Sequence, residues 1–174
     1  LKGATHDAIA YQRTLFVARL EAPVTYPPQD GPLHGLHAGA RHAMLSIYET
    51  TDLALHDAVR AFISGDKKLA GATREKTYQI DARCANLEAV CYNLIATQGP
   101  VASDFRLLQT IIYTDFCLQR MCDKVRRTAR AAKLRVSADI ELPAELIELV
   151  EEEAKTVYRV MGTAASVLVL NDLG

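Results

Sequence analysis

The stretch SDFRLLQTIIYTDFCLQRMCDKVRRTARAAK, residues 103 to 133, decides the fold. It contains neither proline nor glycine, and apolar residues recur along it at spacings of three and four. This is the pattern of an amphipathic helix packed in a bundle. One line of residues on this helix is therefore predicted to face the core: Leu108, Ile111, Asp115, Leu118, Cys122, Val125 and Ala129.

The stretches on either side carry the same pattern. The spacing of the apolar residues predicts amphipathic helices over residues 34–64 and 67–97, with Gly65 as the C-cap of the first. The prolines occur only in three connections, at 23–32, 100 and 143. Three rods of about 30 residues, each about 45 Å long, joined by short turns must lie antiparallel. The predicted core lines run through Leu45, Tyr48, Asp52, Leu55, Val59 and Phe62 in the first helix, and through Ile80, Cys84, Leu87, Cys91 and Leu94 in the second.

The sequence thus predicts an all-α protein with three regions. Residues 1–33 form an N-terminal segment without assignment, in which 5–21 could be helix or short strand; residues 34–135 form the three-helix bundle; residues 136–174 begin a second, incomplete helical repeat. A fourth helix is expected from about Ala144, with an apolar line through Ile147, Val150, Ala154, Val157 and Met161. We expect the bundle, the N-terminal segment or a second copy of the chain to cover this line, and favour a homodimer or an incomplete chain.

Composition limits the partners. The chain has 20 basic and 21 acidic side chains, so its overall charge does not indicate nucleic-acid binding. The longest apolar run, about residues 164–170, is far shorter than a membrane-spanning helix, and the N-terminus lacks the pattern of a signal peptide. A cytoplasmic protein without membrane insertion is expected. The four cysteines lie among apolar residues and are expected to be reduced core residues: Cys84, Cys91, Cys117 and Cys122.

Carboxylates on the inward faces are the candidate site. Asp115 lies on the core line, with Gln119 and Asp123 at i+4 and i+8, and the second helix adds Asp81 and Glu88 beside its own line. An inward carboxylate is costly unless a cation or hydrogen bonds compensate it. Two interpretations stay open: an oxygen-rich site for a divalent metal or iron, or structural pairing with a cation or hydroxyl such as Arg120, Lys124, Arg74 or Tyr48.

Basic side chains gather at the end of the third helix and acidic ones at the start of the fourth. Helix dipoles favour both placements, and an exposed patch of one sign also steers association with a partner. Arg126, Arg127 and Arg130 are the candidate partner-binding residues.

Two stretches of the chain are specific enough to suggest a family: QGPVASDFRLL, residues 98–108, and LQRMCD, residues 118–123. They resemble the Q-x-P-V-A-x-D-L-R turn and the L-E-R-x-G-D stretch of the PhoU-type phosphate uptake regulators, and residues 36–135 as a whole resemble one repeat of that family. The resemblance implies two three-helix repeats and a non-enzymatic adaptor that links a phosphate ABC transporter ATPase to a sensor histidine kinase. It also implies acidic E(D)-x-x-x-D motifs that bind metal clusters in some members.

Carried over by position, the family's metal motifs fall on Thr77 and Asp81 in the second helix and on Gln119 and Asp123 in the third, so both have lost their first acid. A metal site built from Asp81, Asp115, Gln119 and Asp123 is therefore expected to be weak, because an amide or a hydroxyl replaces a charged oxygen ligand. The alternatives are a metal-binding helical-bundle enzyme, although no Glu-x-x-His motif is present, and an accessory cytosolic domain of a sodium/phosphate symporter.

Overall fold

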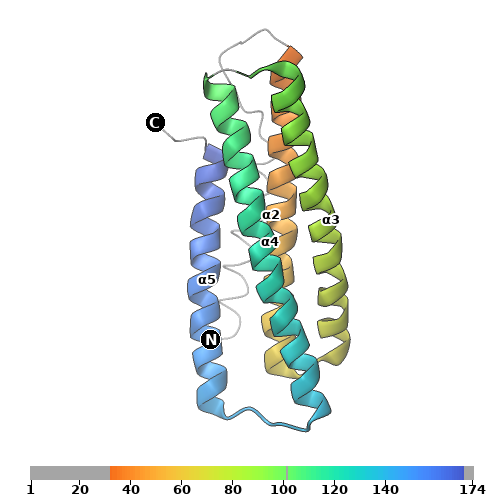
Figure 1. The fold of residues 1–174 in the computed structure, drawn as a ribbon. Coiled ribbons are helices and arrows are strands. Elements are labelled where there is room, and N and C mark those ends of the chain that lie inside the picture. The colour runs from red at the N-terminus through yellow and green to blue at the C-terminus, as the bar shows by residue number, and fades with distance from the viewer. Residues whose placement is uncertain (1–31, 101, 171–174) are drawn as a thin grey trace.

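The computed structural model describes residues 32–100 and 102–170, and within these residues it contains four helices and no strand. They are α2 (Pro32–Ser64), α3 (Lys67–Gln98), α4 (Ala102–Ser137) and α5 (Ala144–Leu170). Figure 1 shows them running alternately up and down, side by side. The all-α prediction is confirmed, and the predicted starts and ends of the helices differ from these by only a few residues. The expectation for residues 5–21 lies outside the described residues.

A tight corner joins α2 to α3. Gly65 has a φ of +73°, and its N–H donates to the Ala61 carbonyl oxygen at 3.0 Å, which ends α2. The Asp66 carboxylate then accepts a hydrogen bond from the Leu69 N–H at 2.8 Å and caps α3. Because only glycine adopts a positive φ at little cost, the predicted C-cap at Gly65 is confirmed.

Helices α2, α3 and α4 enclose the main core. Every residue of the lines predicted for α3 and α4 is buried, including Asp115, whose side chain is 1% exposed. The predicted apolar lines of α3 and α4 therefore face the shared core, and they define the sides of α3 and α4 that form their common seam.

The first part of the core line predicted for α2 is confirmed, since Leu45 and Tyr48 are buried, but the rest of the line differs. Asp52, Leu55, Val59 and Phe62 are only partly buried, and the fully buried line runs beside them through Thr51, Ala54, Ala58 and Ala61. Small side chains on this line let the three helices pack closely. Because the prediction followed the large apolar residues, it placed the core line on a neighbouring face of α2.

Helix α5 packs along α2, and its Met161 and Ala165 belong to the same core cluster. The Tyr48 hydroxyl of α2 donates to the Met161 carbonyl oxygen of α5, and His56 stacks on Tyr158 with ring centroids 3.6 Å apart. Ala154, Met161 and Ala165 are buried here, while Val157 of the predicted line is 41% exposed.

Three of the four cysteines are core residues, as predicted. Cys84, Cys91 and Cys122 are buried, and burial raises the pKa of the Cys91 and Cys122 thiols to about 11. The prediction for Cys117 is wrong, since this residue is exposed on α4. It directly precedes the buried Leu118 and so lies off the core line.

Candidate functional site

The residues predicted for a metal lie along the seam between α3 and α4, in two separate groups. Asp81 and Asp123 belong to the first group, Asp115 and Gln119 to the second. Asp115 and Asp123 are eight residues apart on α4, which corresponds to about 12 Å of helix axis. The seam therefore does not gather the four residues around one point.

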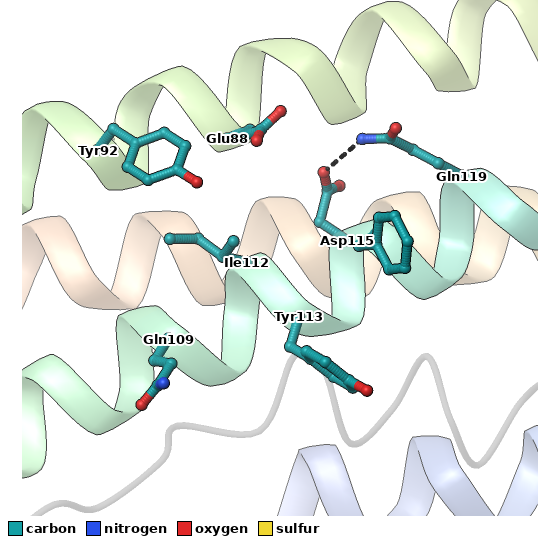
Figure 2. Close-up of a pocket in the computed structure, with 8 residues that line it drawn as sticks. Glu88, Tyr92, Gln109, Ile112, Tyr113, Asp115 and Gln119 are labelled. Atoms are coloured by element: carbon teal, nitrogen blue, oxygen red, sulfur yellow. Dashed lines mark hydrogen bonds between the residues drawn. The ribbon is translucent and has the colours of Figure 1, made fainter.

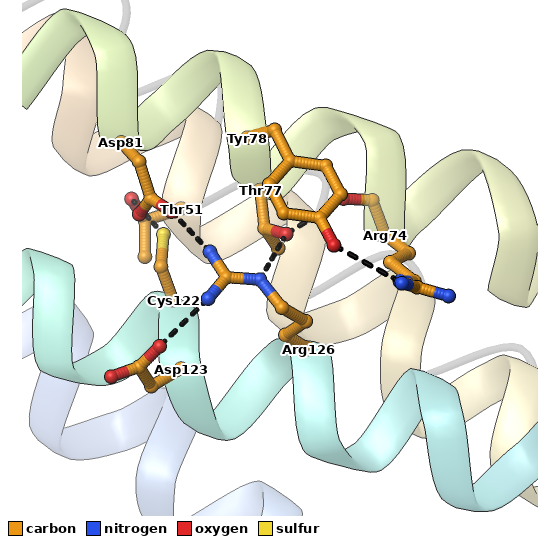
Figure 3. A network of polar contacts seen from close by, with 8 residues as sticks. All are labelled: Thr51, Arg74, Thr77, Tyr78, Asp81, Cys122, Asp123 and Arg126. Atoms are coloured by element: carbon orange, nitrogen blue, oxygen red, sulfur yellow. Dashed lines mark hydrogen bonds and ion pairs between the residues drawn. The ribbon is translucent and has the colours of Figure 1, made fainter.

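The first group closes around a guanidinium, as Figure 3 shows. Arg126 of α4 pairs with the Asp81 carboxylate of α3 through Nη2 and with Asp123 through Nη1 at 2.8 Å. Its Nε donates to the Thr77 hydroxyl at 3.1 Å, and its guanidinium carbon lies 4.9 Å from the centre of the Tyr78 ring. We call these five residues the Arg126 cluster.

The helix geometry explains the direction of Arg126. It directly follows the buried Val125, and it lies one turn beyond Asp123 on the edge that faces α3. The Arg126 side chain is only 24% exposed, compared with 38% for Asp81 and 59% for Asp123. A planar donor fork satisfies two carboxylates and a hydroxyl at once, which an ammonium cannot do in the same plane.

The Arg126 cluster does not fit a metal ion as it stands. The cation that Asp81 and Asp123 need is supplied by the chain itself, and Thr77 provides only a hydroxyl where the family motif has an acid. Across residues 32–100 and 102–170, no three His, Cys, Asp or Glu side chains are grouped so that they could hold a metal. An ion at Asp81 and Asp123 would first have to displace Arg126.

The second group lines a hollow of about 310 Å³ between α3 and α4. Figure 2 shows Glu88 of α3 directed toward Asp115 and Gln119 of α4, and Tyr92 of α3 directed toward Ile112 of α4. The Gln119 amide donates to Asp115 Oδ2 at 3.0 Å. We call this hollow the Asp115 pocket; its walls also include Gln109, Ile112, Tyr113 and Phe116.

Asp115 has a strong effect on the thiol beside it. The pKa of Cys84 is raised well above its usual range, first by burial and next by a hydrogen bond to Asp115 and the negative charge of that carboxyl. Cys84 is thus a protonated thiol, a weak donor beside Asp115, and not a nucleophile.

The candidate partner-binding residues separate into two kinds. Arg127 and Arg130 are exposed on α4, whereas Arg126 is held inside the Arg126 cluster. Sequence reasoning grouped the three by charge and missed the role of Arg126 as counter-ion. The signal was present, because Arg126 adjoins the core residue Val125 and lies opposite Asp81 in the antiparallel alignment.

Comparison with known proteins now identifies the family. The family model described as PhoU domain matches residues 44–132, from within α2 to near the end of α4, and both groups lie inside this range. The match covers more than half of the chain. The chain belongs to the PhoU domain family.

Curated relatives agree with this assignment. One from Pseudomonas aeruginosa, named phosphate-specific transport system accessory protein PhoU homolog, is 30% identical over 109 residues, which is 63% of this chain and 45% of that protein. A PhoU homolog from Zymomonas mobilis is 27% identical over 135 residues, 78% of this chain and 52% of that protein. The PhoU of Serratia marcescens is 33% identical over 92 residues, 51% and 38% of the two chains. No solved structure matches significantly.

The chain spans about half the length, or less, of these curated relatives.

Proposed function

We propose that the chain regulates phosphate uptake in the cytoplasm, as a non-enzymatic accessory protein of a phosphate transport system. The observation that carries this proposal is the PhoU domain match across α2, α3 and α4, joined to relatives whose names place them in phosphate-specific transport. Among the described helices, none is long and apolar enough to cross a membrane.

Loss of the gene tests this function. A regulator that restrains uptake is expected to leave phosphate uptake and phosphate-starvation genes active in phosphate-rich medium when it is deleted, and the full chain should restore repression. Uptake of labelled phosphate and a starvation-promoter reporter measure both effects. Unchanged uptake and reporter activity after deletion would refute the proposal.

The partners proposed are the ATPase of a phosphate ABC transporter and a sensor histidine kinase, contacted through the exposed Arg127 and Arg130. Arg127→Glu and Arg130→Glu are each expected to weaken capture of these partners, since reversing an exposed charge mainly lowers the association rate. Arg106→Glu is the matched control, because Arg106 is also exposed but lies at the other end of α4. Equal capture by all three variants would contradict this surface.

Arg126 needs a different variant. A carboxylate at position 126 would place three acids together in the Arg126 cluster, so lost capture would report damage to the fold and not to a docking surface. Arg126→Gln, checked for helix content by circular dichroism, is therefore the informative change at this position.

We also propose a homodimer formed through α5. Five large apolar side chains of this helix are more than a third exposed, which favours a second copy as their cover. Light scattering should give twice the monomer mass, and Val160→Lys should reduce it. Leu134→Lys on α4, where Leu134 is 59% exposed, is the control. The five side chains are Leu146, Leu149, Val157, Val160 and Val167.

Metal binding at Asp81, Asp115, Gln119 and Asp123 stays a prediction, and the structure changes how to test it. Restoring the acids with Thr77→Asp and Gln119→Glu should raise affinity for Mn²⁺ or Fe³⁺ strongly only when Arg126→Ala removes the competing guanidinium. Calorimetry on the double and triple variants compares them. Equal affinities would show that Arg126 does not compete with the ion.

A further inference from the structure

Asp115 is the one acidic side chain of the described residues that is fully buried, with 1% of its surface exposed. Its Oδ2 accepts from Gln119, and the Cys84 thiol is only a weak donor to this carboxyl, while Oδ1 has no hydrogen-bond partner in the described part of the chain. Leaving a buried carboxylate oxygen unpaired carries a large cost in free energy. A group that brings a donor or a positive charge to Oδ1 would remove that cost.

Asp115 lines the Asp115 pocket, so a group bound there would lie beside its carboxyl. Glu88 adds a second carboxylate from α3, and Figure 2 shows it directed toward the same space. The remaining walls are largely aromatic: Tyr92 is 54%, Phe116 54% and Tyr113 72% exposed. Carboxylates at the base and aromatic rings at the rim are the features that recognise organic cations, whose charge interacts with a ring face.

The same seam already holds such a cation two turns away. In the Arg126 cluster one carboxylate from α3, one from α4 and a tyrosine of α3 surround a guanidinium. Glu88 lies seven residues after Asp81 on α3, and Asp115 lies eight residues before Asp123 on α4. Because the helices are antiparallel, these steps lead in the same direction along the seam. The tyrosine of the pocket, Tyr92, lies one turn after Glu88 on α3, whereas Tyr78 lies one turn before Asp81.

We propose that the Asp115 pocket binds a guanidinium or alkylammonium group, held by Asp115 and Glu88 as Asp81 and Asp123 hold Arg126. The group comes from outside the seam, either from a free small molecule or from a basic side chain of a bound protein. The proposal is independent of the phosphate-related function, since it depends only on the geometry of α3 and α4.

A metal ion fits the pocket less well. Asp115 and Glu88 are the only two acids that line it, and the described residues contain no group of three ligands of the kinds that metals prefer. A guanidinium, in contrast, needs two planar acceptors and an aromatic face, all of which the walls offer.

The test measures binding of methylguanidinium and of a short arginine-containing peptide to the full chain by NMR. Asp115→Asn keeps an oxygen that can accept from Gln119 but removes the charge, and Glu88→Gln removes the second charge. Each is expected to weaken binding about tenfold, the size of losing one charge-assisted hydrogen bond. Glu75→Gln, an exposed position of α3, is the matched control and should bind as the unmodified chain does.

The two probes separate the sources. Binding of methylguanidinium as tightly as the peptide supports a small-molecule ligand, and binding of the peptide alone supports a protein side chain. Several results would overturn the proposal: no binding of either probe at about 10 mM, equal binding by Asp115→Asn, Glu88→Gln and the control, or binding of Mn²⁺ alone that Asp115→Asn abolishes. Circular dichroism of each variant confirms that the helices are intact, so lost binding is not mistaken for unfolding.

Discussion

Removing the Arg126 guanidinium should lower the free energy of unfolding, because this group joins α4 to α3. The geometry allows the loss to be divided between its two acidic partners, Asp81 and Asp123. In Arg126→Gln, Asp81 and Asp123 lose their cation and Thr77 loses a donor. The Arg126–Asp123 pair lies within one helix and is largely exposed, so we expect about 0.3 kcal/mol from it. The Arg126–Asp81 pair joins two helices and is about two-thirds buried, so we expect about 1 kcal/mol.

With the hydroxyl bond included, Arg126→Gln should lower the free energy of unfolding by about 1.5 kcal/mol, or the melting temperature by about 3–6 °C for a chain of this size. Urea unfolding followed by circular dichroism gives the free energies of the single variants Arg126→Gln, Asp81→Asn and Asp123→Asn and of the two doubles. The coupling of Arg126 with Asp81 should exceed that with Asp123 about threefold. If the two couplings are equal, or both are indistinguishable from zero, the buried role assigned to Arg126 is mistaken.

Three further changes test other parts of the fold. Gly65→Ala should cost about 1–2 kcal/mol of unfolding free energy because of its positive φ, whereas Gly39→Ala, inside α2 with open space around it, should stabilise by about 0.5 kcal/mol; thermal melting compares them. Leu118→Ala should cost about 3 kcal/mol in urea unfolding, since the leucine is 1% exposed, and a cost below about 1 kcal/mol would contradict its burial. Burial against Tyr158 lowers the pKa of His56, so stability should be complete above about pH 6.5 and fall as the pH drops below it. His56→Gln should remove that part of the pH dependence in acid titrations of unfolding.

The periodicity of the sequence was sufficient for much of the fold. Long apolar repeats and a few breakers determine where α3 and α4 begin and end, and their core lines follow from large residues at fixed spacing. The second half of the core line of α2 could not be found in this way, because alanines at 54, 58 and 61 carry little periodic signal although they are fully buried.

The candidate site was predictable in its residue types but not in its pairing. Asp81 and Asp123 do lie on facing helices, as the antiparallel arrangement required. Their counter-ion depends on how α4 is rotated about its own axis. A small change in that rotation decides whether Arg126 points toward α3 or into solvent. Because the prediction considered only charge, it grouped Arg126 with Arg127 and Arg130 at the exposed basic end of α4.

The guanidinium between Asp81 and Asp123 has a consequence for how the protein responds to its surroundings. The charge that neutralises the Arg126 cluster belongs to the chain itself, so this cluster does not depend on an ion taken up from solution. Chelators should therefore leave the contribution of the Arg126 cluster to the unfolding temperature unchanged.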